Sequence, residues 1–597
     1  MIGEQKKLDS LISSGNFLIP PYQRAYEWRL SNFEDFIEDI SHYEKYRELG
    51  FIGTIILRDC GDRKWEIVDG QQRITSLLLF TIALTKRLIE LHEKKGEGIS
   101  SGSVRRSIQR YENLYIDRFE EPRLIAHEKI RGSFNEICSI ENSHIDRNIF
   151  KNKNSITQAY LAFEEQANKC KSIKEVENML NVIFDLDVMT ITVKKEEEAF
   201  HIFETTNARG KELEVGDLLR NHIFSNVPEK DRSQVKERWD SIIDKACGQS
   251  VAMLRQYYFT KQGYISKKLL YKEIKKLNID AKKLLNEIEE YVTFFEIAKR
   301  GTKEDFASYI LEIFHGRRFD AEGLQKMFIS ISALRDFNQI QPFPVLYSFL
   351  KAFKKITSSE TRINKKNVTT FITNIEKFHY VNYKIGSNRA NKVENLYAIT
   401  ANDILKSNKK ESFKKKIENF YKKLSDLLDP LEVFEAKFVE ITYKNKRDIR
   451  YIFSTLDTYL KSKHKEGISD IYNPGEALSP SLDNIEHWAP QNFTNKNDEY
   501  YRVWESLSDD VINNIGNLFV MYSRKNSQLQ NKAPAEKHKI CQSISSTTPS
   551  SRVFNDFIKT YSNDFDNWDE KAINKRAKDL ALLSYAKLWK LELKYWI

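Results

Sequence analysis

The amino-acid sequence predicts a mainly α-helical protein with small mixed α/β regions, and three observations lead to this fold class. From about residue 220 to 470, apolar residues recur at helical spacing. The N-terminal part instead interleaves β-branched stretches with helical patterns. A short apolar stretch, "NLFVMY", predicts one more strand among C-terminal helices. The 597 residues exceed what one hydrophobic core holds, so we expect about three domains.

The N-terminal domain, residues 1–225, is predicted to be of the α+β class. "FLIPPYQRAYEW" (17–28) predicts a short strand that ends at Pro20-Pro21, because proline cannot continue a ladder. "FIGTIILRD" and "KWEIV" flank "CGDR", which is typical of a hairpin. The remaining predicted elements are helices at 31–46, 74–95 and 196–210 and a strand at 186–193.

A helical scaffold, residues 226–466, and a C-terminal domain, residues 467–597, are predicted to follow. Within the scaffold, "KKLLNEIEEYVTFFEIAKRG" (282–301) places its apolar residues on one helical face and ends at a capping glycine, Gly301. A turn-rich stretch, 467–484, separates the scaffold from the last domain. The final helix is predicted to pack back through Ile573, Leu580 and Leu583.

Charge and cysteine usage restrict the class of protein. Lys and Arg exceed Asp and Glu by 95 − 85 = 10, which favours a polyanionic partner such as nucleic acid. The five cysteines are scattered without a C-x-x-C pair, which excludes a disulfide framework and a cysteine-ligated zinc site. We therefore expect a cytoplasmic protein. The longest apolar run, "LLLFTIAL" (77–84), is too short to span a membrane, so no membrane association is expected.

Polar residues of the C-terminal domain follow the order of a ββα-metal site. Glu486 and His487 are adjacent in "IEHWAPQNF", Asn517 opens the predicted strand, and Asn526 stands where a helix is expected to begin. A neutral imidazole at His487 is suited to deprotonate water. Glu486 and Asn526 offer the oxygen ligands that Mg²⁺ or Mn²⁺ requires, and Asn517 is available to orient the imidazole. In isolation, a Glu-His pair is more often an ordinary surface pair.

A second constellation lies in "PPYQRAYEW" and "EIVDGQQRITSLLL". Asp69-Gly70 is a predicted turn, so Gln71, Gln72 and Arg73 fall in the first turn of the following helix. Helix N-termini bind anions, and an arginine there binds phosphate in a bidentate manner. Gln23-Arg24 is placed to close the other side of such a pocket. The alternative is a simple hairpin turn in which Arg73 extends into water.

The C-terminal motifs resemble a known family. "E-H-W-A-P-Q", "I-G-N-L" and "N-S-Q-L-Q-N-K" are similar to the HNH domain at the C-terminus of GmrSD-type modification-dependent restriction enzymes. Trp488 stands where the family typically has isoleucine, and Lys537 or Lys539 corresponds to a later lysine of the pattern. The order of residues also looks like the HNH domain of RNA-guided nucleases. The resemblance implies that His487 is the general base, with the ligand roles given above.

The N-terminal motifs resemble the same family. "P-Y-Q-R-x-Y-x-W" and "D-G-Q-Q-R" are similar to its N-terminal domain, which is related to ParB and sulfiredoxin folds. "FHIFETTNARGKELEVGDLLRNHIF" matches a further segment through Asn207, Arg209, Gly210 and Asp217. The resemblance implies binding and hydrolysis of a nucleoside triphosphate (GTP, ATP or another NTP), with Asp69, Gln71, Gln72 and Arg73 central.

Both resemblances together predict an NTP-regulated, Mg²⁺-dependent DNA endonuclease of antiphage defence, a type IV restriction enzyme. Its expected substrate is foreign, modified double-stranded phage DNA, and the helical middle is expected to contact phosphates. Two alternatives remain: a non-cutting, ParB-like, NTP-dependent DNA-binding regulator, and an RNA-directed nuclease toxin. Assembly as a homodimer, the nucleotide preference and the DNA modification stay open.

Overall fold

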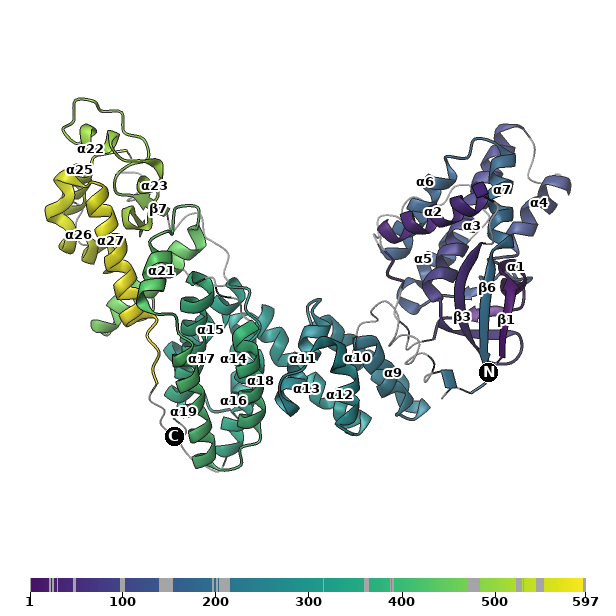
Figure 1. The fold of residues 1–597 in the computed structure, drawn as a ribbon, viewed down its shortest axis with the longest axis horizontal. Coiled ribbons are helices and arrows are strands. Elements are labelled where there is room, and N and C mark those ends of the chain that lie inside the picture. Colours follow the sequence, from purple (N-terminus) through teal and green to yellow (C-terminus); the bar gives the residue numbers. More distant parts are fainter. Residues whose placement is uncertain are drawn as a thin grey trace. The chain divides into compact units, whose positions relative to one another are not determined.

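A computed structural model of the chain describes most of its 597 residues. It forms two compact units: Met1–Ser241 with Leu277–Asn286, and Ile242–Lys276 with Glu287–Ile597 (Figure 1). The described residues are 2–20, 23, 26–28, 30–46, 50–96, 102–138, 154–195, 198–199, 202, 215–314, 316–358, 364–386, 388, 391–469, 484–521, 529, 531–543 and 552–593.

The first unit contains a six-stranded mixed sheet in the order β1-β6-β3-β4-β2-β5. The predicted hairpin is confirmed: β3 and β4 pair antiparallel, and Gly61, Asp62 and Arg63 turn the chain with positive φ. The predicted strands at 17–28 and 186–193 are confirmed as the short β2 and as β6. The strands are β1 (Ile2–Lys7), β2 (Asn16–Leu18), β3 (Phe51–Asp59), β4 (Lys64–Asp69), β5 (Leu124–Ile125) and β6 (Asp187–Val193).

Helix α3 (Gln71–Lys94) forms the centre of this unit. It is buried along most of its length, as its apolar sequence predicts, and begins three residues before the predicted start. Helices α4, α6 and α7 pack against it (Figure 1). The other helices are α1 (Leu8–Ile12), α2 (Leu30–Tyr46), α4 (Gly102–Glu112), α5 (Glu128–Cys138), α6 (Ser155–Ala167), α7 (Ile173–Asp185), α9 (Val215–Ser225) and α10 (Arg232–Lys245). Most of the predicted helix at 196–210 lies outside the described residues.

Every helix or strand element that the structure describes between 250 and 463 is a helix, as predicted. Helix α13 buries Leu284, Ile288, Tyr291 and Phe295, and it ends just before Gly301. Among the described residues, no helix is long and apolar enough to cross a membrane. The helices are α11 (Ser250–Gln262), α12 (Leu270–Lys276), α13 (Ala281–Arg300), α14 (Lys303–Ile313), α15 (Ala321–Asp336), α16 (Phe343–Ile356), α17 (Lys365–His379), α18 (Asn391–Leu405), α19 (Lys410–Asp426), α20 (Leu431–Phe438) and α21 (Lys446–Lys463).

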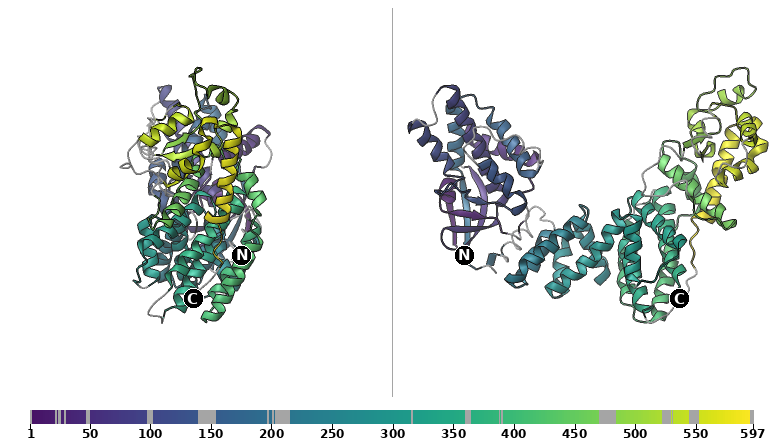
Figure 2. Two further views of the ribbon diagram at one scale, coloured as in Figure 1. Left: turned by 90° about the vertical axis from the view of Figure 1, so that its left-hand side faces the viewer. Right: turned by 180° about the vertical axis from the view of Figure 1, so that it is seen from behind.

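A small antiparallel pair, β7 (Asn484–His487) and β8 (Leu518–Met521), is set among the C-terminal helices. Trp488, which stands where the resembling family has isoleucine, is fully buried against the rings of Phe519, Phe557 and Phe565. Helices α25 (Pro534–Ser543), α26 (Arg552–Tyr561) and α27 (Glu570–Leu583) follow. As predicted, α27 packs back on this unit, against α20, and α26 packs on α21 (Figure 2).

A buried carboxyl group, Glu376, lies in the helical part of the second unit. Its Oε1 accepts hydrogen bonds from Tyr451 Oη and from Trp589 Nε1, and it lines a cavity of about 470 Å³. Burial raises the pKa of Glu376 to about 7, although these two hydrogen bonds and Lys377 oppose the shift. Near neutral pH, this side chain therefore carries a proton that it would lose on unfolding.

We expect Glu376→Gln to raise the thermal stability of this unit at pH 8 and to have little effect at pH 4.5. Between about 4.5 and 7 the folded state binds the proton more tightly than the unfolded state, so wild-type stability falls as pH rises through this range. The full shift corresponds to at most about 3 kcal/mol. Thermal denaturation at both pH values checks this, with the exposed Glu418→Gln as control. An equal change at both pH values would contradict it.

Candidate active site

His487 lies at the end of β7, and its imidazole is oriented by a side chain that the sequence did not indicate. Its Nε2 lies 3.1 Å from Asn513 Oδ1, which also accepts from Gln491 Nε2. Asn513 Nδ2 donates to the Asp509 carbonyl, so Oδ1 is the amide atom that faces the ring. Because Oδ1 only accepts, Nε2 carries the proton, and Nδ1 keeps its lone pair.

The surroundings of His487 keep its imidazole neutral. Burial lowers the pKa of His487 to about 4, against the opposing effect of its hydrogen bond to Asn513, and the charges of Lys537 and Lys446 lower it further. The ring of Tyr443 lies 4.6 Å from the imidazole, centre to centre, and Lys446 Nζ lies 4.5 Å from the centre of the Tyr443 ring. At neutral pH the side chain is therefore a neutral base in a mostly buried position.

Glu486, the neighbour of His487, forms a buried ion pair with Lys537 of α25. Lys537 Nζ lies 2.7 Å from Glu486 Oε1 and donates to the His487 carbonyl at 2.6 Å. Lys537 is fully buried and Glu486 nearly so. Burial raises the pKa of Glu486 and lowers that of Lys537, while the attraction between them opposes both shifts. Lys537, rather than Lys539, is therefore the lysine that joins the helix to the strand pair.

Asn517 has a different role from the predicted one. Its Oδ1 accepts from Ala489 N and Trp568 Nε1, and its Nδ2 donates to the carbonyls of Ala489 and Ile512. These four bonds use the full capacity of the amide, so none remains for the imidazole. Asn517 also ends a 3₁₀ turn, Ile515–Asn517, immediately before β8. It fixes the loop after His487, and the orienting role belongs to Asn513.

We expect Asn517→Ala to lower the free energy of unfolding by about 3 kcal/mol or more, because several buried polar groups would lose their partner. Urea denaturation followed by tryptophan fluorescence measures this. Asn513→Ala, at a half-buried position, is expected to reduce cleavage with a much smaller change in stability. Wild-type stability in Asn517→Ala together with lost cleavage would return the orienting role to Asn517.

Asn526, the second predicted metal ligand, lies outside the described residues. Within the described part of the chain, no group of three or more His, Cys, Asp and Glu side chains is positioned to hold a metal ion. Glu486 is the described half of the predicted ligand pair. Lys537 pairs with Oε1 of this carboxylate, so the fit to a hard cation rests on the carboxylate oxygen as a donor type and not on the ion pair.

The two N-terminal motifs meet in the first unit. Gln23 is buried and its Nε2 donates to the carbonyl of Val68 at 2.6 Å, at the end of β4. Gln72 Oε1 accepts from the backbone of Glu27 at 3.1 Å. Gly70 caps α3 with φ of 95°, and Gln71 is buried in its first turn. Arg24 and the matched residues Asn207, Arg209 and Gly210 lie outside the described residues.

The Arg73 guanidinium donates hydrogen bonds to the backbone of β3, whereas the sequence predicted that it binds phosphate. Its Nη1 and Nη2 donate to the carbonyls of Ile52 and Thr54, each at 2.9 Å, and Nη2 lies 3.9 Å from Asp69. The irregularity of β3 between these residues depends on Gly53, with φ of 94°, where a Cβ would lie 2.2 Å from Arg73 Nη1. Arg73 therefore fastens α3 to the irregular strand.

A buried polar cluster beside Gln23 contains residues that the sequence did not indicate. Arg220 of α9 is 5% exposed, donates to the Gln23 carbonyl and lies 3.3 Å from Asp240 of α10. Among the described residues, Arg220 Nε has no hydrogen-bond partner. Burial and the nearby Arg220 charge lower the pKa of His127 to about 4. The only sequence signal for Arg220 is its place in "DLLRNHIF".

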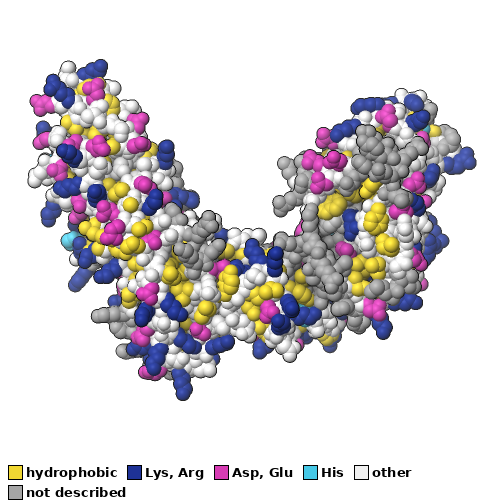
Figure 3. Space-filling model, viewed as in Figure 1, with side chains coloured by type: hydrophobic (Ala, Val, Ile, Leu, Met, Phe, Trp, Pro, Cys, Tyr) yellow, Lys and Arg dark blue, Asp and Glu magenta, His cyan; other side chains and the backbone are white. Residues whose placement is uncertain are grey.

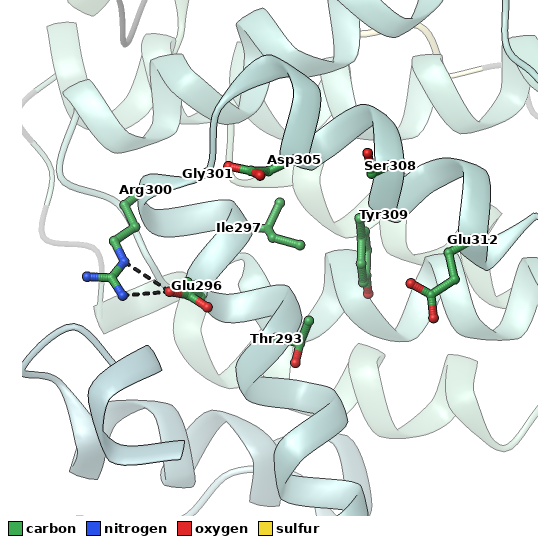
Figure 4. Close-up of a pocket in the computed structure, with 9 residues that line it drawn as sticks. All are labelled: Thr293, Glu296, Ile297, Arg300, Gly301, Asp305, Ser308, Tyr309 and Glu312. Carbon is green, nitrogen blue, oxygen red and sulfur yellow. Dashed lines mark hydrogen bonds and ion pairs between the residues drawn. The ribbon is translucent and has the colours of Figure 1, made fainter. Parts of the chain in front are cut away.

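A cavity of about 450 Å³ between α13 and α14 lies apart from both constellations (Figure 4). Three of its four charged side chains have structural partners. Glu296 pairs with Arg300 at 2.5 Å, and Asp305 accepts from the backbone of Thr302 in a capping box. Figure 4 draws the fourth, Glu312, without a contact to the other side chains shown, and we assign this cavity no catalytic role.

Two family models match the chain. The model described as "GmrSD restriction endonuclease, N-terminal domain" matches residues 7–224, and the model described as "GmrSD restriction endonucleases, C-terminal domain" matches residues 429–583. This chain belongs to the GmrSD restriction endonuclease family. No curated protein matches it. The order of the two GmrSD domains on one chain agrees with the expectation from the motifs.

The GmrSD C-terminal match begins well before the predicted boundary at residue 467. The structure explains this early start, because the segment just before α21 contacts the residues around the His487 imidazole. Tyr443 N donates to the carbonyl of Asn513, and Ile515 N donates to that of Ile441. Asn514 Nδ2 donates to the Val439 carbonyl. The segment that carries Tyr443 and Lys446 is therefore part of the site.

Proposed function

We propose that this restriction endonuclease cleaves modified double-stranded DNA at His487, in a reaction that depends on Mg²⁺ and is regulated by an NTP. The observation that carries the proposal is a neutral imidazole, oriented by Asn513, beside a buried carboxylate on an antiparallel strand pair. This arrangement agrees with the ββα-metal site of HNH nucleases. Defence against phage follows from restriction.

In the proposed reaction, His487 Nδ1 takes a proton from water, and the oxygen of that water attacks the scissile phosphorus. The bond from phosphorus to its leaving oxygen breaks, and that oxygen takes up a proton. Asn513 holds the Nε2 proton and so keeps the Nδ1 lone pair available. Since the pKa of His487 is about 4, the base is already neutral at physiological pH.

We propose that Glu486 and Asn526 hold the divalent cation, Mg²⁺ or Mn²⁺, in this site. The carboxylate and amide oxygens are the ligands that such hard cations prefer. When bound, the cation neutralises charge on the phosphate and on the leaving oxygen. Lys537 holds Glu486 Oε1, so it positions the carboxylate next to the base.

We further propose that the N-terminal domain is a ParB-like NTPase that controls cleavage, with the NTP phosphates beside the "DGQQR" turn. Gln23, Gln71 and Gln72 line the start of α3, and the positive end of a helix dipole favours an anion there. Because Arg73 is engaged by β3, we assign the phosphate contact to Arg220, whose Nε has no partner among the described residues.

We expect Arg220→Lys to weaken NTP binding at least tenfold, because a lysine lacks the bidentate fork. Arg73→Lys is expected to leave NTP affinity within about threefold and to lower thermal stability, because α3 loses its attachment to β3. Calorimetric titration with GTP and ATP measures both. NTP affinity lost in Arg73→Lys but kept in Arg220→Lys would reverse this assignment.

Parallel cleavage assays test the proposed reaction against its two alternatives. Modified and unmodified DNA and an RNA of equal length are incubated with the protein, Mg²⁺ and each NTP. We expect DNA to be cut. DNA binding without cleavage would favour the ParB-like regulator, and cleavage of RNA alone would favour the nuclease toxin.

A further inference from the structure

The positive charge of the chain is concentrated in one helical segment, from α16 to α19. Residues 343–426 contain 18 Lys and Arg and 7 Asp and Glu, a net charge of 18 − 7 = +11. The whole chain has a net charge of +10, so the remaining residues together carry 10 − 11 = −1. A basic residue excess that is confined to one segment is a sign of a polyanion partner rather than of general solubility.

The fold brings most of these cations to one end of the helical bundle. The end of α16, the start of α17, the end of α18 and the start of α19 all meet there (Figure 1). Lys355 Nζ donates to Asn408 Oδ1 at 2.6 Å, and Lys416 Nζ donates to Ser407 Oγ at 3.1 Å, which ties these turns together. Lys and Arg side chains cover much of the lower end of this bundle in Figure 3. We call this surface the basic end; its members are Arg317, Arg318, Lys354, Lys355, Lys365, Lys366, Lys406, Lys409, Lys410, Lys414, Lys415 and Lys416.

Three lysines of the basic end form no side-chain contact that stabilises the fold among the described residues. Lys406, Lys409 and Lys415 are exposed, and within the described residues the side chain of none of them has an ion-pair or hydrogen-bond partner. Lys409 and Lys415 border an open hollow of about 420 Å³ together with Lys416, Ser412, Asn419 and Glu411. Their ammonium groups are therefore available to anions in solution.

Several lysines of the basic end lie at the N-terminal ends of helices, where a positive charge is electrostatically unfavourable in the protein alone. Cations stabilise the C-terminal end of a helix, which accounts for Lys354 and Lys355 on α16. At an N-terminal end the same dipole disfavours a cation. Yet α17 starts with Lys365 and Lys366 and has no acidic residue in its first turn. Helix α19 has Lys409 at its N-cap, without a side-chain capping bond, where Asp, Ser or Asn is usual.

We propose that the basic end is a docking surface for the phosphate backbone of duplex DNA. A bound polyanion would remove this electrostatic cost, because phosphates beside the N-terminal ends of the helices neutralise the lysines there. The surface contacts phosphates without reading bases, so it adds affinity to any sequence. Only the choice of DNA over another polyanion rests on the proposed function. Binding at the basic end does not require cleavage.

The test measures binding without metal by the full-length His487→Ala protein. Fluorescence anisotropy of an unmodified DNA duplex is followed over a series of NaCl concentrations. Changing Lys406, Lys409 and Lys415 to Gln is expected to raise Kd roughly tenfold or more. It should also reduce the slope of log Kd against log salt by about 2–3, near 0.9 per lost phosphate contact. An unchanged slope would overturn the proposal.

Two further variants keep the result interpretable. The matched control changes Lys169, Lys171 and Lys174 of the first unit, which are equally exposed but interspersed with Glu165, Glu175 and Glu177. It is expected to leave Kd and slope unchanged, and an equal loss there would overturn the assignment to the basic end. Lys409→Asp is expected to weaken binding while leaving Tm unchanged or higher, since it supplies a preferred N-cap. Undiminished binding by Lys409→Asp would count against the surface, and RNA duplex bound in place of DNA would overturn the named partner.

Discussion

His487→Ala is expected to reduce the rate of DNA cleavage by about 10²–10⁴, the usual contribution of a general base. Folding is expected to persist, because the hydrogen bonds that hold the loop after His487 come from Asn517 and not from the imidazole. The Glu486–Lys537 pair also remains, since Lys537 contacts the backbone carbonyl of residue 487. Single-turnover cleavage with excess protein, alongside DNA binding and thermal denaturation, measures the three properties separately.

The exposed His464 on the same unit supplies a matched control, and His464→Ala is expected to cleave like wild type. Asn513→Asp is a second probe, because its carboxylate would favour the protonated imidazole and shift the pH dependence of cleavage upward. Cleavage by His487→Ala within tenfold of wild type would remove this residue from the role of base.

The second large effect is expected at the buried pair. Lys537→Met leaves the Glu486 carboxylate buried without a partner, which typically costs about 3–5 kcal/mol of stability. Glu486→Gln alone leaves the Lys537 ammonium buried and is expected to cost a similar amount. In the double variant neither charge remains, so stability should largely return. Urea denaturation of the four proteins gives the coupling energy.

Activity separates the structural from the catalytic contribution of this pair. The restored double variant is expected to stay inactive, because it lacks the proposed cation ligand Glu486. Additive losses of stability would mean that the two side chains do not interact in the folded protein. Full cleavage by the double variant would mean that Glu486 holds no cation that the reaction needs.

Local patterns predicted the hairpin, the buried helix α3 and the adjacent Glu486 and His487, because these features depend on neighbours in the sequence. Asn513 was not predicted, since it is 26 residues from His487 and reaches the ring only through the short helix that ends beside it. The backbone contacts of Arg73 were not predicted for a similar reason. The irregularity at Gly53 that presents two carbonyls to its guanidinium is not visible in the sequence.

The roles of Tyr443 and Lys446 also depend on contacts between distant segments. Tyr443 precedes a long helix and Lys446 begins it, so both were predicted as part of the scaffold. Backbone hydrogen bonds to Asn513 and Ile515 nevertheless bring this segment beside the imidazole. For Asn517, the sequence indicated a role in the site that the contacts do not support. Its residue type and its position in the motif predicted that it orients the imidazole, but its four hydrogen bonds hold the loop after His487.

The central claim is that an oriented His487, with Glu486 and a divalent cation, cuts DNA under control of an NTP. The most direct measurement is cleavage of a panel of modified and unmodified DNAs by the wild-type protein, with Mg²⁺ or a chelator and with or without each NTP. We expect modified DNA to be cut when both the cation and one NTP are present, and His487→Ala to leave it intact. Cutting that persists in the chelator, or an unbroken backbone in every DNA of the panel, would contradict it.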